Sequence, residues 1–205
     1  MTDLIGFLLI TSLVVMGPGV DFALITKRTI KTGKIDGVKT ALGLTSGALI
    51  HTSAAAFGLS ILIMQSAAAF EIIRYLGALY LIYIGVSSFI KRKKVDKEEN
   101  INIKTNSSAY RQGLLSNTLN PKVAIFFLTF LPQFVIDGMN VSLQFLIMGA
   151  IYSLLSIIWF LSIVYLLNFI RKFLMSNFIQ NVIDKITGLV LIGFGLNLVF
   201  NDPKK

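Results

Sequence analysis

Long apolar runs separated by short polar connectors make up most of this 205-residue chain. A helix needs about 20 apolar residues to cross the hydrocarbon core of a membrane, which is roughly 30 Å thick. Six runs approach or exceed this length, and they cover approximately residues 4–26, 37–64, 67–90, 113–135, 143–169 and 182–200. The pattern predicts an all-α integral membrane protein with six transmembrane helices, built as one domain over residues 1–205.

The first apolar run is expected to stay in the mature protein. Cleaved signal peptides begin with a basic region and end at a site of small residues. Met1-Thr2-Asp3 contains no basic residue, and no such cleavage site follows the run.

Composition excludes a water-soluble domain, because 55% of the residues are hydrophobic, 14% are charged and the mean hydropathy is +0.76. The absence of cysteine excludes disulfides, thiolate metal sites and thiol catalysis. A net charge of +9 would suggest nucleic-acid binding in a soluble protein. In a membrane protein the same excess predicts orientation instead, so no nucleic-acid partner is expected.

The basic residues are distributed unevenly over the connectors. Fifteen of the 19 lie in or beside the connectors that follow the first, third and fifth apolar runs. The positive-inside rule places these three connectors in the cytoplasm. A multi-pass membrane protein with both termini outside is therefore predicted.

One long polar stretch, residues 91–111, divides the predicted helices into two groups of three. It is interpreted as a solvated cytoplasmic linker attracted to anionic lipid, with a regulatory role as the alternative. If the groups 1–90 and 112–200 are repeats, their odd helix number makes them insert with opposite orientation. Matching features occur in the same order in both groups: Gly17-Pro18-Gly19 with Asn120-Pro121-Lys122, and Glu71, Arg74 and Gly77 with Asp184, Lys185 and Gly188.

The two proline motifs are predicted to break the first and fourth helices. A proline inside a helix removes a backbone hydrogen bond, and adjacent glycine lets the backbone bend. Paired breaks in inverted repeats are typical of transporters whose binding site lies near the membrane midplane. Gly17, Pro18, Gly19, Asn120 and Pro121 are therefore candidate site residues, with simple packing kinks as the alternative.

Ionisable side chains inside the predicted spans are Asp21, His51 and Lys122. At 1.5 Å per residue, Asp21 lies roughly 9 Å from the cytoplasmic Lys27 and Lys122 roughly 16 Å from Arg111, so their depths overlap within side-chain reach. A charge at this depth costs at least ~2.5 kcal/mol unless it is paired or hydrated. We therefore expect Asp21 and Lys122 to pair directly or through a zwitterionic amino acid. A permanent structural ion pair is the alternative.

His51 lies on a predicted helix face of small residues, which are Gly43, Gly47, Ala54 and Gly58. Such faces allow close helix packing, which is the favoured interpretation for the glycines. A proton relay is one hypothesis for His51, because imidazole titrates near neutral pH. A hydrogen bond from His51 to a neighbouring helix is the alternative. Ser153, Ser156, Trp159 and Asn197 are interpreted as interhelical contacts rather than path-lining residues.

Several motifs are missing from the sequence. It contains no GxxxxGK[ST] loop, no HExxH motif and no GxSxG elbow, so no nucleotide-driven motor, intramembrane metalloprotease or serine hydrolase is indicated. No bound metal, cofactor or enzymatic activity is expected. Secondary transport is the class of function that remains after these exclusions.

Three stretches of the chain resemble the LysE/RhtB family of small amino-acid export proteins. They are MGPGVDFALITKRTIKTGKIDGVKTALGLTSGALIH, YLGALYLIYIG and YRQGLLSNTLNPKVAIFFLTFLPQFV. Pro18, Gly19 and Asp21 match one motif of the family, and Asn120, Pro121 and Lys122 match another. The family often has a second proline where this chain has Val20, so a softer first break is expected.

The resemblance implies an inner-membrane exporter of amino acids driven by the proton motive force. Its partners would be an amino-acid substrate, protons and the lipid bilayer, with a homo-oligomer left open. One buried acid balanced by one buried base favours a neutral amino acid, such as threonine or homoserine, over a dibasic one. The alternative function is a cation or metal efflux protein, or a channel, on a related scaffold.

Overall fold

The computed structural model describes residues 4–17, 19–61, 67–87, 89, 108–136, 138–174 and 177–200. Within these ranges the chain is helical and contains no strand. The elements, in chain order, are α1 (Leu4–Met16), α2 (Val20–Thr32), α3 (Lys34–Ala54), η1 (Ala55–Leu59), α5 (Ala67–Ser87), α6 (Ala109–Thr118), α7 (Pro121–Ile125), η2 (Phe126–Phe130), η3 (Leu131–Phe134), α8 (Val141–Leu174) and α9 (Asn177–Phe200).

All six predicted apolar runs are largely helical where the structure describes them, with breaks in the first and fourth. Two continuous stretches, Lys34–Leu59 and Val141–Leu167, are long and apolar enough to cross a membrane. Two bent pairs also qualify if each pair is taken as one span: α1 with α2, bent by 50°, and α6 with Pro121–Phe134, bent by 48°. The described residues thus hold two to four candidate spans. Helices α5 and α9, of 21 and 24 residues, cover the two remaining runs.

The second bend differs from the prediction in its local cause. Pro121 does not interrupt a helix from within, because it is the first residue of α7, while α6 has already ended at Thr118. A proline is well tolerated at the first helical position, where its missing N–H would have no partner in any case. The first bend lies between Met16 and Val20, and Pro18 lies outside the described residues.

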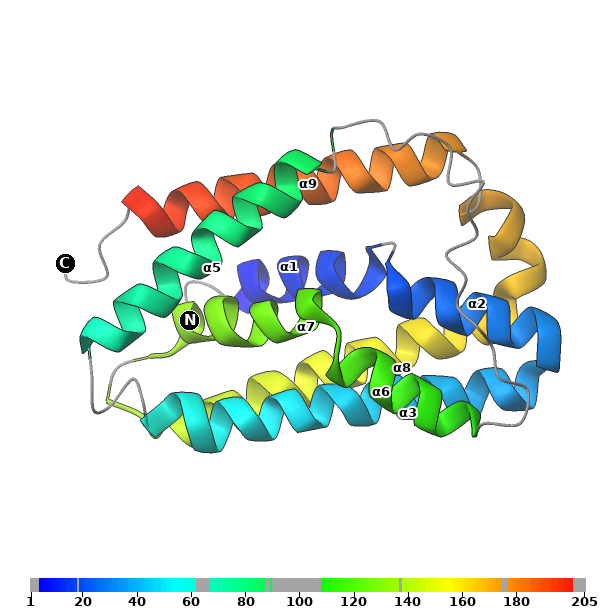
Figure 1. Cartoon of the computed structure of the whole chain (residues 1–205), viewed down its shortest axis with the longest axis horizontal. Helices are drawn as coiled ribbons and strands as arrows, with labels where there is room; N and C mark the ends of the chain where they lie inside the picture. Colours follow the sequence, from blue (N-terminus) through cyan, green and yellow to red (C-terminus); the bar gives the residue numbers. More distant parts are fainter. Residues whose placement is uncertain are drawn as a thin grey trace.

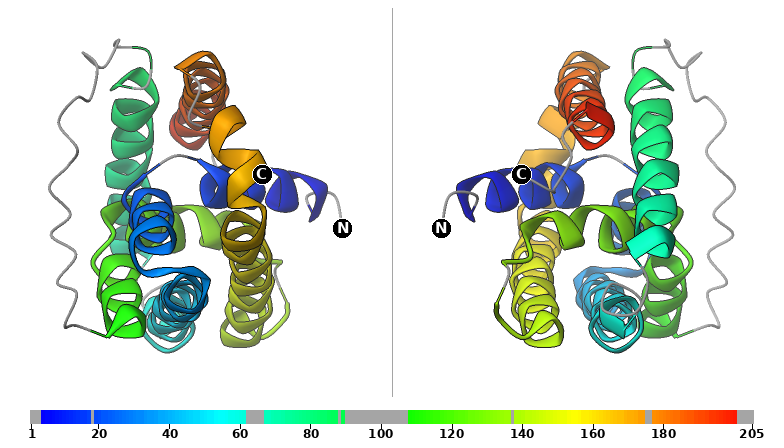
Figure 2. Two further views of the ribbon diagram at one scale, coloured as in Figure 1. Left: turned by 90° about the vertical axis from the view of Figure 1, so that its right-hand side faces the viewer. Right: turned by 90° about the vertical axis from the view of Figure 1, so that its left-hand side faces the viewer.

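The helices form two groups that are joined by the broken ones (Figure 1). Helices α5 and α9 pack against each other along one side of the molecule. Helix α3 packs against α6 and α8 along the opposite side, and α1, α2 and α7 lie between the two groups (Figures 1 and 2). The helix breaks therefore lie inside the molecule, close to its centre.

Glycines bring α3 and α6 into close contact. A Cβ on Gly43 would collide with the carbonyl oxygen of Tyr110, and a Cβ on Gly113 would collide with that of Thr40. Gly47 approaches Asn117 in the same way. Small residues permit this approach between membrane helices, so the predicted packing role of Gly43 and Gly47 is confirmed.

The predicted small-residue face is nevertheless shorter than expected. Ala54 and Gly58 are both exposed, and a Cβ on Gly58 would meet nothing within 4 Å. Gly58 belongs to η1, whose π-helical turn has more residues per turn than an α-helix. The regular three- and four-residue spacing used for the prediction therefore no longer applies beyond Ala54.

The contact between α5 and α9 is reciprocal. A Cβ on Gly85 would lie 2.7 Å from the carbonyl oxygen of Gly188, and a Cβ on Gly195 would lie 2.9 Å from that of Ala78. Residues 78–85 read ALYLIYIG and residues 188–195 read GLVLIGFG. When residues 78–85 are superposed on residues 188–195, Ala78 coincides with Gly188 and Gly85 with Gly195. The two contacts are therefore equivalent.

Substitution of Gly195 by alanine is predicted to destabilise the protein. The new methyl group would lie 2.5 Å from Cγ1 of Ile82, and such overpacking costs about 1–3 kcal/mol. The matched control is Gly193→Ala in the same helix, where a Cβ meets nothing within 4 Å. Thermal unfolding in detergent should show a lower Tm for Gly195→Ala and an unchanged or higher Tm for Gly193→Ala. Equal Tm values would contradict the close packing of α5 and α9.

Candidate functional site

Asp21 lies in the first turn of α2 and is buried, with 8% of its surface exposed. Its Oδ1 accepts a hydrogen bond from Oγ of Ser116 at 2.6 Å. Its Oδ2 accepts hydrogen bonds from Nδ2 of Asn117 at 2.9 Å and from Nδ2 of Asn120 at 3.0 Å. The carboxylate is thus surrounded by neutral donors from α6 and from the segment that joins α6 to α7.

Asn120 connects this carboxylate to the second helix break. Its Oδ1 accepts a hydrogen bond from the backbone N–H of Lys122 at 3.0 Å, which caps the N-terminus of α7. Its Nδ2 donates to Asp21. Asparagine is a favourable capping residue because its side-chain oxygen satisfies one of the free N–H groups at a helix start. One amide therefore both begins α7 and binds the acid of α2.

Lys122 reaches across to the first helix break. Its Nζ lies 3.3 Å from the carbonyl oxygen of Gly17, at the C-terminal end of α1, and donates to it. The last carbonyls of a helix have no partner within the helix and carry partial negative charge, which favours a cation there. A Cβ on Gly17 would lie 2.8 Å from Nζ, so a larger residue at this position would require the end of the lysine side chain to shift. Gly19, by contrast, faces open space.

The structure therefore brings the candidate residues together at one junction. Asp21 is at the start of α2 and Lys122 is in the first turn of α7, while Gly17 and Asn120 form the ends at which they meet. Pro121 follows Asn120 directly and is exposed. Both predicted breaks thus contribute to a single polar site.

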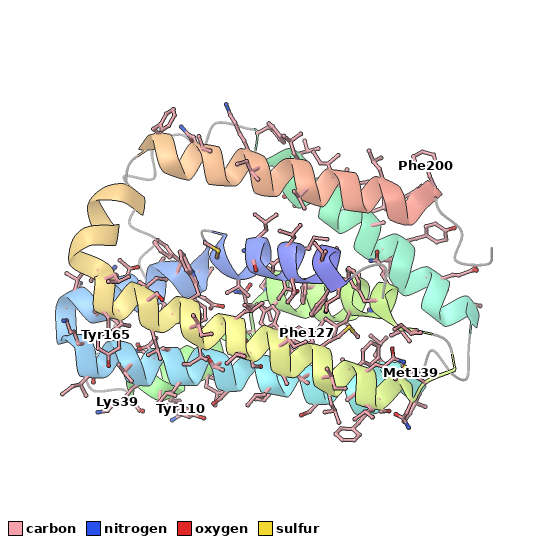
Figure 3. All side chains as sticks on the ribbon, turned by 180° about the vertical axis from the view of Figure 1, so that it is seen from behind. Lys39, Tyr110, Phe127, Met139, Tyr165 and Phe200 are labelled. Carbon is pink, nitrogen blue, oxygen red and sulfur yellow. The ribbon has the colours of Figure 1, made fainter. Side chains whose placement is uncertain are left out.

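His51 belongs to the edge of this site. Its Nε2 lies 3.2 Å from the carbonyl oxygen of Asn117, within hydrogen-bonding distance, and its ring stacks on Phe127 with centroids 5.7 Å apart. Phe127 lies in the centre of the molecule (Figure 3). A contact with the neighbouring helix α6, the alternative considered for His51, is therefore present. The same contact places His51 beside the residue that holds Asp21.

Ser116 and Asn117 were not singled out from the sequence, although they supply two of the three hydrogen bonds to Asp21. A signal was available, because Ser116, Asn117 and Asn120 are polar residues within one predicted membrane span. Polar residues in a span usually face the protein interior. Their convergence on Asp21, which is 95 to 99 residues away in sequence, could not be read from the spacing.

Two apolar clusters flank the polar junction. The larger contains Val14 and Val15 at the end of α1. The second contains Ile25, one turn after Asp21 in α2. Trp159 of α8 packs against both clusters. The buried carboxylate of Asp21 therefore depends on protein groups for its stabilisation.

Helix α8 presents further buried polar groups. Ser153 and Ser156 are buried, and Oγ of Ser153 and Nε1 of Trp159 have no hydrogen-bond partner among the described residues. The side chain of Asn197 lies outside the described residues. The described part of the chain holds no group of three or more His, Cys, Asp or Glu side chains that could bind a metal ion.

Comparison with known proteins identifies the family. The LysE type translocator family matches residues 12–202. The chain belongs to the LysE type translocators. It is 36% identical over 205 residues to the "Uncharacterized membrane protein YrhP" of Bacillus subtilis (strain 168), covering 96% of this chain and 98% of that protein.

Two further relatives are named as efflux proteins. A threonine efflux protein of Salmonella typhi is 25% identical over 190 residues, covering 91% of this chain and 92% of the relative. A leucine efflux protein of Enterobacter sp. (strain 638) is 27% identical over 190 residues, covering 90% and 89%. No solved structure matches this chain significantly.

The departure from the LysE motif at Val20 does not straighten the first break. Val20 is the first residue of α2, a position where proline and other residues are both tolerated. The bend there is 50°, against 48° at the second break. The two breaks therefore have nearly equal bends.

Substitution of Gly47 by alanine is predicted to disturb the site. The added Cβ would lie 2.7 Å from Cβ and 2.8 Å from Oδ1 of Asn117, which must then shift away from Asp21. Loss of a hydrogen bond to a buried charge costs about 1.5–3 kcal/mol. Gly58→Ala, which adds a methyl group in open space, is the control. Thermal unfolding should show a clear destabilisation for Gly47→Ala alone; similar Tm values would contradict the tight contact.

Proposed function

We propose that this LysE-type translocator is a secondary exporter of amino acids, with neutral amino acids such as threonine or homoserine as substrates. The observation that carries the proposal is the buried Asp21 carboxylate at the junction of two broken helices. The names of the relatives support the substrate class, because they include efflux proteins for threonine, homoserine and leucine.

The substrate would bind between the two charges of the junction. A carboxylate offers about four acceptor positions, and three hydrogen bonds to Asp21 are observed, so one further donor can be accommodated. The substrate ammonium would take this position. The substrate carboxylate would bind Lys122, which now donates to Gly17. One acid and one base match a net-neutral zwitterion.

The proposed architecture consists of six transmembrane helices in two inverted repeats of three. Two observations support it: the two breaks have nearly equal bends, and the contacts between α5 and α9 are reciprocal. The reciprocal contacts match Gly188 with Ala78, one residue later than the Gly77 match taken from the sequence. With the positive connectors inside, both termini face outward.

Transport would alternate the access of the junction between the two sides of the membrane by moving one repeat relative to the other. Protons would drive the cycle, with Asp21 as the group that exchanges the proton. His51 would relay it, since it lies next to Asn117.

The first test is an efflux assay. Vesicles loaded with labelled amino acids or metal ions are assayed with and without a pH gradient, for the wild type and for Asp21→Asn. Gradient-dependent amino-acid efflux is expected, and Asp21→Asn should reduce it at least about tenfold, because the substrate ammonium loses its counter-charge. Efflux of metal ions only, or efflux that does not respond to the gradient, would refute the proposal.

The same assay tests the coupling between Asp21 and Lys122. Both charges contact one substrate in the proposal, so the effects of Asp21→Asn and Lys122→Ala should not add in the double variant. Simple additivity would show that the two charges act independently.

A smaller effect is predicted for Ser116→Ala. This variant removes the 2.6 Å hydrogen bond to Asp21 and leaves the charge in place. Its KM for efflux should therefore rise by about tenfold, which is the factor expected for the loss of one hydrogen bond to a charged group. The control is Ser53→Ala, because Ser53 is exposed and bonds only the carbonyl of Leu49 in its own helix. Equal KM values for the two variants would exclude Ser116 from the site.

A further inference from the structure

Arg28 is a buried charge that the proposed transport site does not use. It lies in α2 with only 1% of its surface exposed. Its Nη1 donates to Oε1 of Gln112 in α6 at 3.2 Å, and its Nη2 lies 3.4 Å from Oδ2 of Asp36 in α3. From the sequence it was counted among the basic residues that set orientation. Its burial and its partners in two other helices indicate a more specific role.

Arg28 and Asp21 lie on the same seam between α2 and α6. They are seven residues apart in α2, which places them on one face of the helix, about 10 Å apart. Their partners Gln112 and Ser116 are four residues apart on one face of α6. Leu24 and Ile25 lie between Asp21 and Arg28 along α2, and both are buried.

Arg28 lies nearer than Asp21 to the end of the seam that the proposed topology places in the cytoplasm. Helix α2 ends there at Thr32, and α6 begins there at Ala109. The side chain of Asp36 is 27% exposed, and it also pairs at 3.7 Å with Lys39, whose side chain is 56% exposed. Lys39 lies at the edge of the molecule (Figure 3). A solute that enters the seam from the cytoplasm therefore meets Arg28 before it reaches Asp21.

Helix α2 is bounded by two glycines at which it can pivot, although Gly37 of α3 also closely approaches Thr29 of α2. Helices α3 and α6 are locked together by the close glycine contacts at Gly43 and Gly113. Helix α2 is only 13 residues long and is bounded by Gly19 and Gly33. Gly33 has φ +93°, a conformation that favours glycine, and hinges are formed by a few residues of this kind at element ends.

We propose that α2 is the cytoplasmic gate of this transporter and that Arg28 is its latch, closed by Asp36 of α3 and Gln112 of α6. Movement of α2 away from the α3–α6 pair separates Arg28 from both partners. The same movement opens a path from the cytoplasm to Asp21, so opening the gate gives the substrate access to the site. The inference depends on the proposed function and topology in one respect only, which is the direction of transport through the gate.

The test uses the fact that the chain contains no cysteine. Leu24→Cys places a single thiol between the latch and Asp21, at a position that is 4% exposed. A membrane-impermeant, positively charged methanethiosulfonate reagent is added to inside-out vesicles without substrate. Adding Arg28→Gln should raise the modification rate about tenfold, because the latch loses its charge-assisted contacts. Adding Gln112→Glu should lower the rate, because the latch gains an ion pair.

Lys39→Gln is the matched control, since Lys39 pairs with the same Asp36 but lies outside the seam. Its modification rate should equal that of Leu24→Cys alone. In right-side-out vesicles, Arg28→Gln should leave the rate from the outside unchanged.

Equal rates for Arg28→Gln and Lys39→Gln would overturn the latch, as would a faster reaction for Gln112→Glu. If Arg28→Gln does not fold, the lower modification rate expected for Gln112→Glu still tests the latch. Modification does not require amino-acid efflux. If the protein shows these rate changes but no efflux, the latch is supported and the proposed function is refuted. If it shows efflux but not the rate changes, the proposed function is supported and the gate is refuted.

Discussion

The hydrogen bonding of the buried Asp21 carboxylate determines the centre of this molecule. An ionised carboxylate in an apolar interior is costly unless donors surround it. Ser116, Asn117 and Asn120 supply these donors. Asn120 can reach Asp21 because α6 ends before it and α7 starts after it. The break in one helix is thus what satisfies the charge at the break in the other. Close glycine contacts between α3 and α6 hold Asn117 in position.

The helix breaks also place each charge at a helix end of suitable polarity. Asp21 lies at the N-terminus of α2, where free N–H groups favour an anion. Lys122 bonds the carbonyl of Gly17 at the C-terminus of α1, where free carbonyls favour a cation. An unbroken helix would offer neither end at this depth. The bends therefore create an electrostatic environment that stabilises one negative and one positive charge, as the proposed zwitterionic substrate requires.

The seam between α2 and α6 connects the site with its proposed gate. Polar contacts occur at two levels, Asp21 with Ser116 and Arg28 with Gln112, and buried apolar side chains separate them.

The sequence by itself indicated the helical segments and the positions of the two breaks, because apolar runs and prolines act locally. It also identified Asp21 and Lys122, since charges within apolar runs are rare and costly. Only the tertiary structure decided their partners. Ser116 and Asn117 are almost 100 residues from Asp21, and Arg28 looked like one of many surface charges until its contacts with Asp36 and Gln112 showed it buried. The physical reason is that burial and hydrogen bonding depend on which helices meet, and the spacing of residues along one helix does not contain that information.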